Sequence, residues 1–215
     1  MALTEIIFPP LKADEQIRKG FYTNVPSTVE STFNVPGGPL SSALARVIES
    51  TPVDAEDHRG YLGVFAWESV ETVDKFLQTP GFAGFKASLM AYVDGPPRLQ
   101  FFSSGAGVAP QKTLHGSTHL FLIKAAGTEA QVGQVRQLWG DFAPAFSKVA
   151  GDDVKYHSGD ETQGHNGEFS GFSGWKSLES LNNALEQYST REKLQELRDY
   201  GISISSFVLE LKHVF

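Results

Sequence analysis

The chain has 215 residues, of which 40% are hydrophobic and 20% are charged, a composition typical of a folded globular protein. Its formal net charge of −7 disfavours nucleic acid and anionic membrane surfaces as partners, and the absence of cysteine excludes disulfides, thiolate metal sites and iron–sulfur clusters. The N-terminus lacks the features of a signal peptide, and no stretch approaches the roughly 20 apolar residues of a membrane span, so we expect a cytoplasmic protein.

The first half of the chain alternates between strand-like and helix-like patterns. In chain order, these patterns predict a strand at residues 3–8, a helix at 40–49, a strand at 60–67, a helix at 69–78 with a second piece after a break at 79–81, and a strand at 98–103. Residues 12–39 contain several prolines and one possible helical turn, so we expect a long surface excursion there. The expected order is β-α-β-β-α-β, with the second strand weak or lost.

The second half shows the same order more clearly. Residues 104–115 are rich in Gly, Ala and Pro and are predicted to link a domain at 1–103 to a domain at 116–215. Thr128 and Gln131 form a capping-box pattern before the most periodic helix of the chain. In chain order we expect a strand at residues 117–125, that helix through residue 149, strands at 154–158 and 167–175, a helix at 177–200, either continuous or broken near Thr190, and a strand at 202–215. This β-α-β-β-α-β order is typical of ferredoxin-like folds.

One short motif occurs twice, once in each half. Trp67 ends a predicted strand and is followed by Ser69, and Trp175 and Ser177 repeat this arrangement before a second helix. Both serines are suited to cap the helix that follows them. The two copies are 108 residues apart (175 − 67), about half the chain, which indicates an internal duplication.

The segment from Trp67 to Phe85, and the strand from Thr118 to Lys124, resemble the dimeric α+β barrel superfamily. That superfamily includes antibiotic-biosynthesis-type monooxygenases, stress-responsive barrel proteins and the plant polyketide cyclase that makes olivetolic acid. The resemblance implies an α+β fold in which two ferredoxin-like halves pack sheet to sheet as a barrel within one chain. It implies no particular reaction.

The residues of the cyclase are only partly present at the matching positions. A histidine on the first strand of that family corresponds to His119. The position of its catalytic tyrosine is occupied by Phe76 in the first half and Ala184 in the second, and its catalytic histidine falls at Phe82 and near Thr190. The acid–base pair implied by the resemblance is therefore absent.

The haem-degrading branch of the superfamily offers a second comparison. Trp67 and Trp175 match its tryptophan near the same motif, but its histidine ligand corresponds to Lys86. We therefore do not expect haem to bind through that ligand. His115 and His119 are four residues apart, but they lie in a linker and a strand, where this spacing does not converge on a metal ion. We expect no metal and no cofactor.

Three histidines are candidate catalytic residues. His119 lies on an otherwise apolar strand face, so a core histidine and a base in a cavity both remain open interpretations. His157 and His213 lie on other strands and are candidates to converge with it. The candidate substrate-binding residues are six aromatic side chains: Tyr61, Phe65, Trp67, Phe76, Tyr156 and Trp175. For both tryptophans, a purely structural role is the simpler interpretation.

The 16 phenylalanines favour an apolar cavity with aromatic walls. We therefore expect a cofactor-independent enzyme that cyclises, isomerises or rearranges a polyketide-like or polycyclic small molecule. A cofactor-free monooxygenase is the first alternative, and a non-catalytic ligand-binding or stress-related protein is the second. The expected partner is the small molecule alone, with the chain acting as a pseudo-dimeric monomer or as a homodimer.

Overall fold

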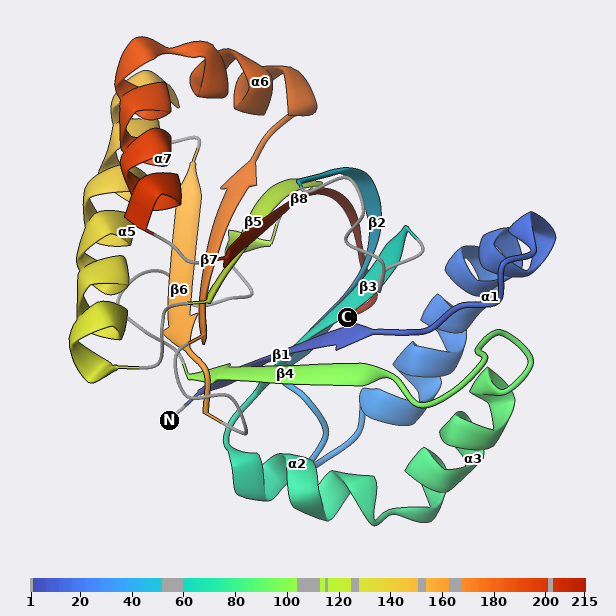
Figure 1. The fold of residues 1–215 in the computed structure, drawn as a ribbon. Helices are drawn as coiled ribbons and strands as arrows, with labels where there is room; N and C mark the ends of the chain where they lie inside the picture. The colour runs from blue at the N-terminus through green and yellow to red at the C-terminus, as the bar shows by residue number, and fades with distance from the viewer. Residues whose placement is uncertain are drawn as a thin grey trace. The chain divides into compact units, whose positions relative to one another are not determined.

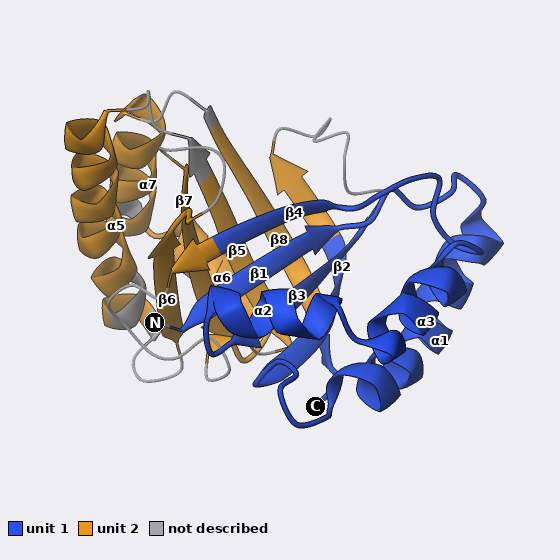
Figure 2. Cartoon of the chain, turned by 90° about the horizontal axis from the view of Figure 1, so that it is seen from below, with its two compact units in different colours: residues 1–47, 56–101, 212–215 blue, residues 48–55, 102–211 orange. Residues whose placement is uncertain are grey.

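The computed structural model describes residues 2–51, 60–103, 113–114, 116–124, 128–150, 154–162, 168–200 and 203–215. Helices and strands are mixed along the chain, which confirms the α+β class (Figure 1). The chain divides into two compact units, coloured separately in Figure 2. Unit 1 contains residues 1–47, 56–101 and 212–215, and unit 2 contains residues 48–55 and 102–211.

Within the described residues, the first half of the chain contains seven elements: β1 (Leu3–Phe8), α1 (Glu15–Phe33), β2 (Ser41–Thr51), β3 (Tyr61–Trp67), α2 (Val70–Leu77), α3 (Pro80–Leu89) and β4 (Arg98–Ser103). Their strands follow the order β4-β1-β3-β2, and β3 is antiparallel to both β1 and β2. This is the strand order of a ferredoxin-like fold.

Three predictions for this half are wrong. Residues 40–49 do not form a helix, because this segment pairs with β3 as strand β2, from Ser41 opposite Ala66 to Arg46 opposite Tyr61. The second strand of the first half is therefore present rather than weak or lost. The apolar residues of this segment fit both periods, and pairing with a buried strand decides between them.

The predicted excursion at 12–39 is also wrong, because it contains the 19-residue helix α1. Asp14 caps this helix by accepting a hydrogen bond from the Ile17 amide at 3.0 Å. Pro26 lies inside the helix, where proline costs about 3 kcal/mol. The helix also buries four large apolar side chains: Phe21, Val25, Val29 and Phe33. Burial of each stabilises the fold by about 1.5–3 kcal/mol, so together they outweigh the cost of the proline.

The described part of the second half also contains seven named elements: β5 (Ser117–Lys124), α5 (Glu129–Ala150), β6 (Lys155–Asp160), β7 (Glu168–Trp175), α6 (Leu178–Glu186), α7 (Tyr188–Tyr200) and β8 (Ser203–His213). Their order, β8-β5-β7-β6, repeats the order of the first half. The helix predicted at 177–200 is broken into two helices, and the break lies at Gln187, three residues before Thr190. Of the predicted linker, the structure describes only residues 113–114, and His115 lies outside the described residues.

The predicted helix caps are confirmed. Ser69 Oγ accepts a hydrogen bond from the Thr72 amide at 3.3 Å, and Ser177 Oγ accepts one from the Ser180 amide at 3.1 Å. In the capping box before α5, the Gln131 amide donates to Thr128 Oγ1 and the Thr128 amide donates to Gln131 Oε1, both at 3.3 Å.

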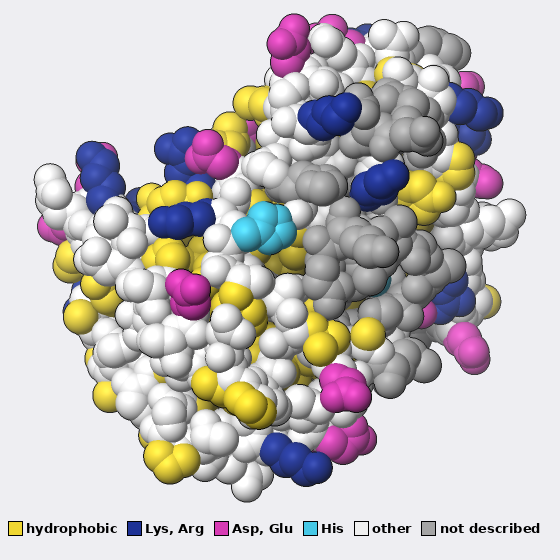
Figure 3. Space-filling model, turned by 180° about the vertical axis from the view of Figure 1, so that it is seen from behind, with side chains coloured by type: hydrophobic (Ala, Val, Ile, Leu, Met, Phe, Trp, Pro, Cys, Tyr) yellow, Lys and Arg dark blue, Asp and Glu magenta, His cyan; other side chains and the backbone are white. Residues whose placement is uncertain are grey.

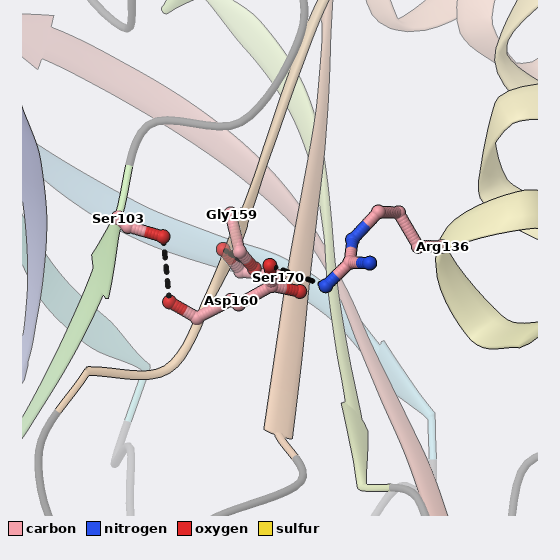
Figure 4. A network of polar contacts seen from close by, with 5 residues as sticks. All are labelled: Ser103, Arg136, Gly159, Asp160 and Ser170. Atoms are coloured by element: carbon pink, nitrogen blue, oxygen red, sulfur yellow. Dashed lines mark hydrogen bonds and ion pairs between the residues drawn. The ribbon is translucent and has the colours of Figure 1, made fainter. Parts of the chain in front are cut away.

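The last residues of β4 belong to unit 2, where they lie against β6. Phe102 forms an isolated antiparallel bridge with Glu161, and Ser103 Oγ donates to the Asp160 carbonyl at 3.2 Å. Arg136 of α5 forms an ion pair with Asp160 at 2.7 Å (Figure 4). Because both side chains are partly exposed, this pair contributes at most about 1 kcal/mol.

Each unit has an aromatic-rich core on the side of its strands that faces its own helices. The opposite strand faces are buried too, as Ile6 and Val64 show in unit 1 and Leu120 in unit 2. Trp67 and Trp175 occupy corresponding positions. Each ends the third strand of its half, and each pairs with the first residue of the first strand.

Candidate functional site

Unit 1 brings its four predicted binding residues into one cluster. Tyr61, Phe65 and Trp67 alternate along β3 and face the helices, because successive strand residues point to opposite faces. Phe76 of α2 packs on Trp67 with ring centroids 5.3 Å apart. The cluster contains no metal ligand set and consists mainly of aromatic rings.

Phe33 of α1 lies at the centre of this aromatic cluster. Its ring centroid is 5.1 Å from that of Phe65 and 4.8 Å from those of Phe76 and Phe85. Phe82 and Phe85 come from α3, which has no fully buried residue of its own. The cluster is therefore deeply buried at β3 and less enclosed at α3.

The structure adds a residue that the sequence analysis did not identify, Glu5 of β1. Glu5 pairs with Phe65, is only 4% exposed, and accepts a hydrogen bond at Oε2 from Trp67 Nε1 at 2.8 Å. Burial raises the pKa of this carboxyl to about 7, although the hydrogen bond from Trp67 acts in the opposite direction. Ser42 pairs with Phe65 on its other side, so a buried hydroxyl lies on the same face of the strands.

In unit 2 the strand register groups His119 with two other predicted residues. His119 pairs with Ser173, and Ser173 pairs with Tyr156, so the three side chains lie side by side on the helix-facing side. Trp175 Nε1 donates to Ser173 Oγ at 3.0 Å. His119, Tyr156 and Trp175 thus share one small polar region within an apolar core.

The environment of His119 is strongly apolar. Its ring lies 4.1 Å from that of Phe121, it is 4% exposed, and its Nδ1 has no hydrogen-bond partner among the described residues. Burial lowers the pKa of His119 to about 3, and the positive charge of Arg198 lowers it further. The imidazole is therefore neutral at pH 7, but it is a weak base.

His157 does not share the strand face of His119, and His213 belongs to the other unit. His157 pairs with Phe172, which lies on the face of β7 opposite to Ser173, so His157 points away from the helix-facing side. Among the described histidines, His213 is the exposed one, and it belongs to unit 1. Figure 3 colours the histidine side chains that reach the surface on one face of the molecule. The register thus separates His157 from His119, and the catalytic roles of the three histidines stay predictions.

Glu5 and His119 occupy corresponding positions in the two halves. Leu3 pairs with Trp67 and Ser117 pairs with Trp175, so the residue two positions later is Glu5 in β1 and His119 in β5. Two features of the sequence point to Glu5. It aligns with His119 when the first strands of the two halves are superposed, and it is an acidic residue within a strand of mainly apolar residues.

Two absences can be stated for the described residues, one of a metal-ligand group and one of a membrane-spanning helix. Within these ranges, no three His, Cys, Asp or Glu side chains are grouped closely enough to hold a metal ion. Among the helices that the structure describes, none combines the length and the apolar character needed to cross a bilayer.

No protein-family model and no curated protein sequence matches the chain. Solved structures do resemble it. An anthrone oxidase-like protein is 13% identical with a TM-score of 0.67, covering 99% of this chain and 91% of the other. A candidate monooxygenase of Fusobacterium nucleatum subsp. nucleatum ATCC 25586 is 12% identical (TM-score 0.63, 99% and 93% covered), and one of Lactobacillus acidophilus NCFM is 8% identical (0.62, 100% and 94%). At these identities the similarity shows the fold alone.

Proposed function

We propose that this protein is an enzyme that needs no cofactor and oxygenates a polycyclic or polyketide-like aromatic molecule. The observation that carries the proposal is the aromatic cluster of unit 1, in which Phe33, Phe65, Trp67 and Phe76 pack together beside a buried carboxyl group. Aromatic walls with few polar groups suit a flat aromatic ligand. The names of three of the structural neighbours, two candidate monooxygenases and an anthrone oxidase-like protein, support this class of reaction.

The proposed reaction begins with removal of a proton from an activated carbon of the substrate. An anthrone, for example, carries a methylene group between two aromatic rings. Its conversion to a carbonyl consumes one O₂ and releases one water, and the substrate supplies all the electrons. The protein then has to bind the rings and accept a proton, which needs no redox group of its own.

The second candidate is the cyclisation, isomerisation or rearrangement that the sequence predicts. It begins with the same proton transfer but consumes no oxygen. The position of His119, which matches a histidine of the olivetolic acid cyclase, favours it. We also propose that the two halves arose by duplication, because their strand orders and their tryptophan positions agree.

Turnover of anthrone with and without oxygen tests the proposal. The purified chain is incubated with anthrone in air and under nitrogen, with a chelator in both cases, and oxygen uptake and anthraquinone are measured. We expect uptake of one O₂ per anthraquinone at a rate above that of buffer alone. Conversion of a polyketide-like substrate under nitrogen would favour the second candidate. Binding without any turnover would leave the ligand-binding alternative.

A further inference from the structure

We propose that Glu5 is the catalytic base of this protein and takes a proton from an aromatic ligand bound in the cluster of Phe33, Phe65, Trp67 and Phe76 in unit 1. The ligand class is a planar aromatic molecule with an acidic hydroxyl or an activated C–H group. This inference rests on the proposed function and deepens it, because it places the proton transfer on a residue of unit 1 instead of the three histidines.

The geometry of Glu5 leaves one carboxylate oxygen available. Oε2 accepts the indole hydrogen bond of Trp67 at 2.8 Å, whereas Oε1 accepts no hydrogen bond from the described residues. Glu5 lies on the helix-facing side of β1, next to Phe65 in the ladder. The indole hydrogen bond holds the carboxylate in place, on the strand face that carries Phe65 and Trp67.

The second half of the chain shows that a carboxylate is not needed to accept the hydrogen bond of the buried tryptophan indole. Trp175, which corresponds to Trp67, donates to the neutral hydroxyl of Ser173 at 3.0 Å. A buried carboxylate is much more costly than a buried hydroxyl. The indole of Trp67 in unit 1 therefore donates to an ionisable carboxyl, whereas the indole of Trp175 in unit 2 donates to a neutral hydroxyl. Ionisable groups at buried positions are common at sites of acid–base chemistry.

Glu5 has no buried counter-charge in the part of the chain that the structure describes. It is the one Asp, Glu, Lys or Arg side chain among the buried residues described, and the two buried histidines, His119 and His157, belong to unit 2. Helices α1 and α2 bury only apolar residues, and α3 buries none. The titratable groups of these helices and of β2 are exposed or partly exposed: Glu15, Arg18, Lys19, Tyr22, Glu30, Arg46, Glu49, Glu71, Asp74, Lys75 and Lys86.

Glu5 is also better matched to proton transfer near neutral pH than His119. Burial raises the pKa of Glu5 to about 7, whereas burial lowers the pKa of His119 to about 3. A general base is most effective when its pKa lies near the operating pH, because it is then both unprotonated and basic. Glu5 meets both conditions, and His119 meets only the first.

The α3 side is the less enclosed side of the cluster, and in this proposal the ligand enters there. Phe82 and Phe85 are partly buried, and their rings pack on Phe33 and Phe76 without any fully buried anchor in α3. The rings of the ligand would displace those of Phe82 and Phe85 and take over their contacts. From Phe76 the ring contacts continue to Trp67, which donates the hydrogen bond to Glu5.

The chemical step is a proton transfer. The C–H or O–H bond of the ligand breaks, its electron pair stays on the ligand, and a new O–H bond forms on the Glu5 carboxylate. In the oxygenation proposed above, the resulting anion reduces O₂. In an isomerisation, Glu5 returns the proton to another atom of the ligand.

Hydrogen exchange of anthrone tests Glu5 without the oxygen step. The full chain is incubated with anthrone in D₂O under nitrogen, and loss of the methylene protons is followed by NMR. We expect exchange faster than in buffer alone, rising with pH as Glu5 ionises. Glu5→Gln should slow it by about 10²–10⁴-fold, the usual contribution of a general base. Glu30→Gln, on the exposed side of α1, removes an equal charge and should have no effect.

A second measurement shows that the variant is intact and that the carboxyl titrates. Near-ultraviolet circular dichroism should be the same for Glu5→Gln and for the unmodified chain. The infrared band of a protonated carboxyl should vanish near pH 7 in the unmodified chain and be absent in the variant. Exchange at the buffer rate in the unmodified chain, or full exchange in a folded Glu5→Gln variant, would overturn the proposal. Exchange without oxygen uptake would refute oxygenation alone, and oxygen uptake unchanged by Glu5→Gln would refute Glu5 alone.

Discussion

Replacing Glu5 with glutamine should change how the stability of the protein depends on pH. In the unfolded chain this carboxyl titrates at its ordinary pKa of 4.5, whereas in the folded protein burial raises the pKa to about 7. The folded state therefore binds an extra proton between these values. The resulting stabilisation is fully present below pH 4.5 and is lost as the pH rises through 7.

The difference between the two pKa values corresponds to about 3 kcal/mol of unfolding free energy, at 1.36 kcal/mol per pH unit. Glutamine has a similar shape and an amide oxygen that can still accept the indole hydrogen bond of Trp67, but it cannot become charged. Relative to the unmodified chain, Glu5→Gln should therefore gain about 3 kcal/mol between pH 4.5 and pH 8.5.

Denaturant unfolding at several pH values, followed by circular dichroism, measures this change. The slope of free energy against denaturant has to agree between the two proteins for the comparison to hold. Glu30→Gln controls for the loss of one negative charge at an exposed position and should show no such trend. A difference below about 1 kcal/mol across this pH range would refute the assignment of a neutral-range pKa to Glu5.

Three further outcomes follow from unit 2. Burial lowers the pKa of His119 from 6.5 to about 3, so the stability that the neutral imidazole supports above pH 6.5 is lost as the pH falls toward 3. The difference in unfolding free energy between His119→Gln and the unmodified chain should therefore shift by about 3 kcal/mol in favour of the variant from pH 7 to pH 4, in the same unfolding assay. A Cβ at Gly171 would lie 2.6 Å from ring atoms of Trp139, so Gly171→Ala should destabilise by about 1–3 kcal/mol, whereas Gly140→Ala, with no atom within 4 Å, should stabilise the helix by about 0.5–1 kcal/mol. Ser177→Ala removes a confirmed cap and should lower the thermal midpoint, at a cost of about 1 kcal/mol.

Local chemistry in the sequence was enough to determine most elements of the fold. Ser69, Ser177 and the Thr128–Gln131 pair mark helix starts, because only side chains with an acceptor satisfy the first amides of a helix. The repeated tryptophan predicted two halves of the same construction, and both halves have the same strand order. Aromatic residues at alternate positions of β3 likewise indicated the cluster of unit 1.

Tertiary pairing decided what local patterns left ambiguous. The segment at β2 fits a helical period as well as a strand period, and only its pairing with β3 makes it a strand. Pro26 suggested a break, but burial of the apolar side of α1 keeps that helix continuous. In both cases the free energy comes from contacts with residues distant in the sequence, which periodicity does not report.

The candidate site was divided in the same way. The sequence shows that His119, His157 and Glu5 lie on strands, but the face on which each side chain lies depends on register, and a shift of one residue reverses it. The pairing of Ser173 with both His119 and Tyr156 places those two on the helix-facing side and His157 on the other. The sequence by itself determined which ionisable groups are available in the strands. Only the tertiary structure decided that Glu5 becomes basic near neutral pH and His119 does not, because burial sets the cost of charge on each side chain.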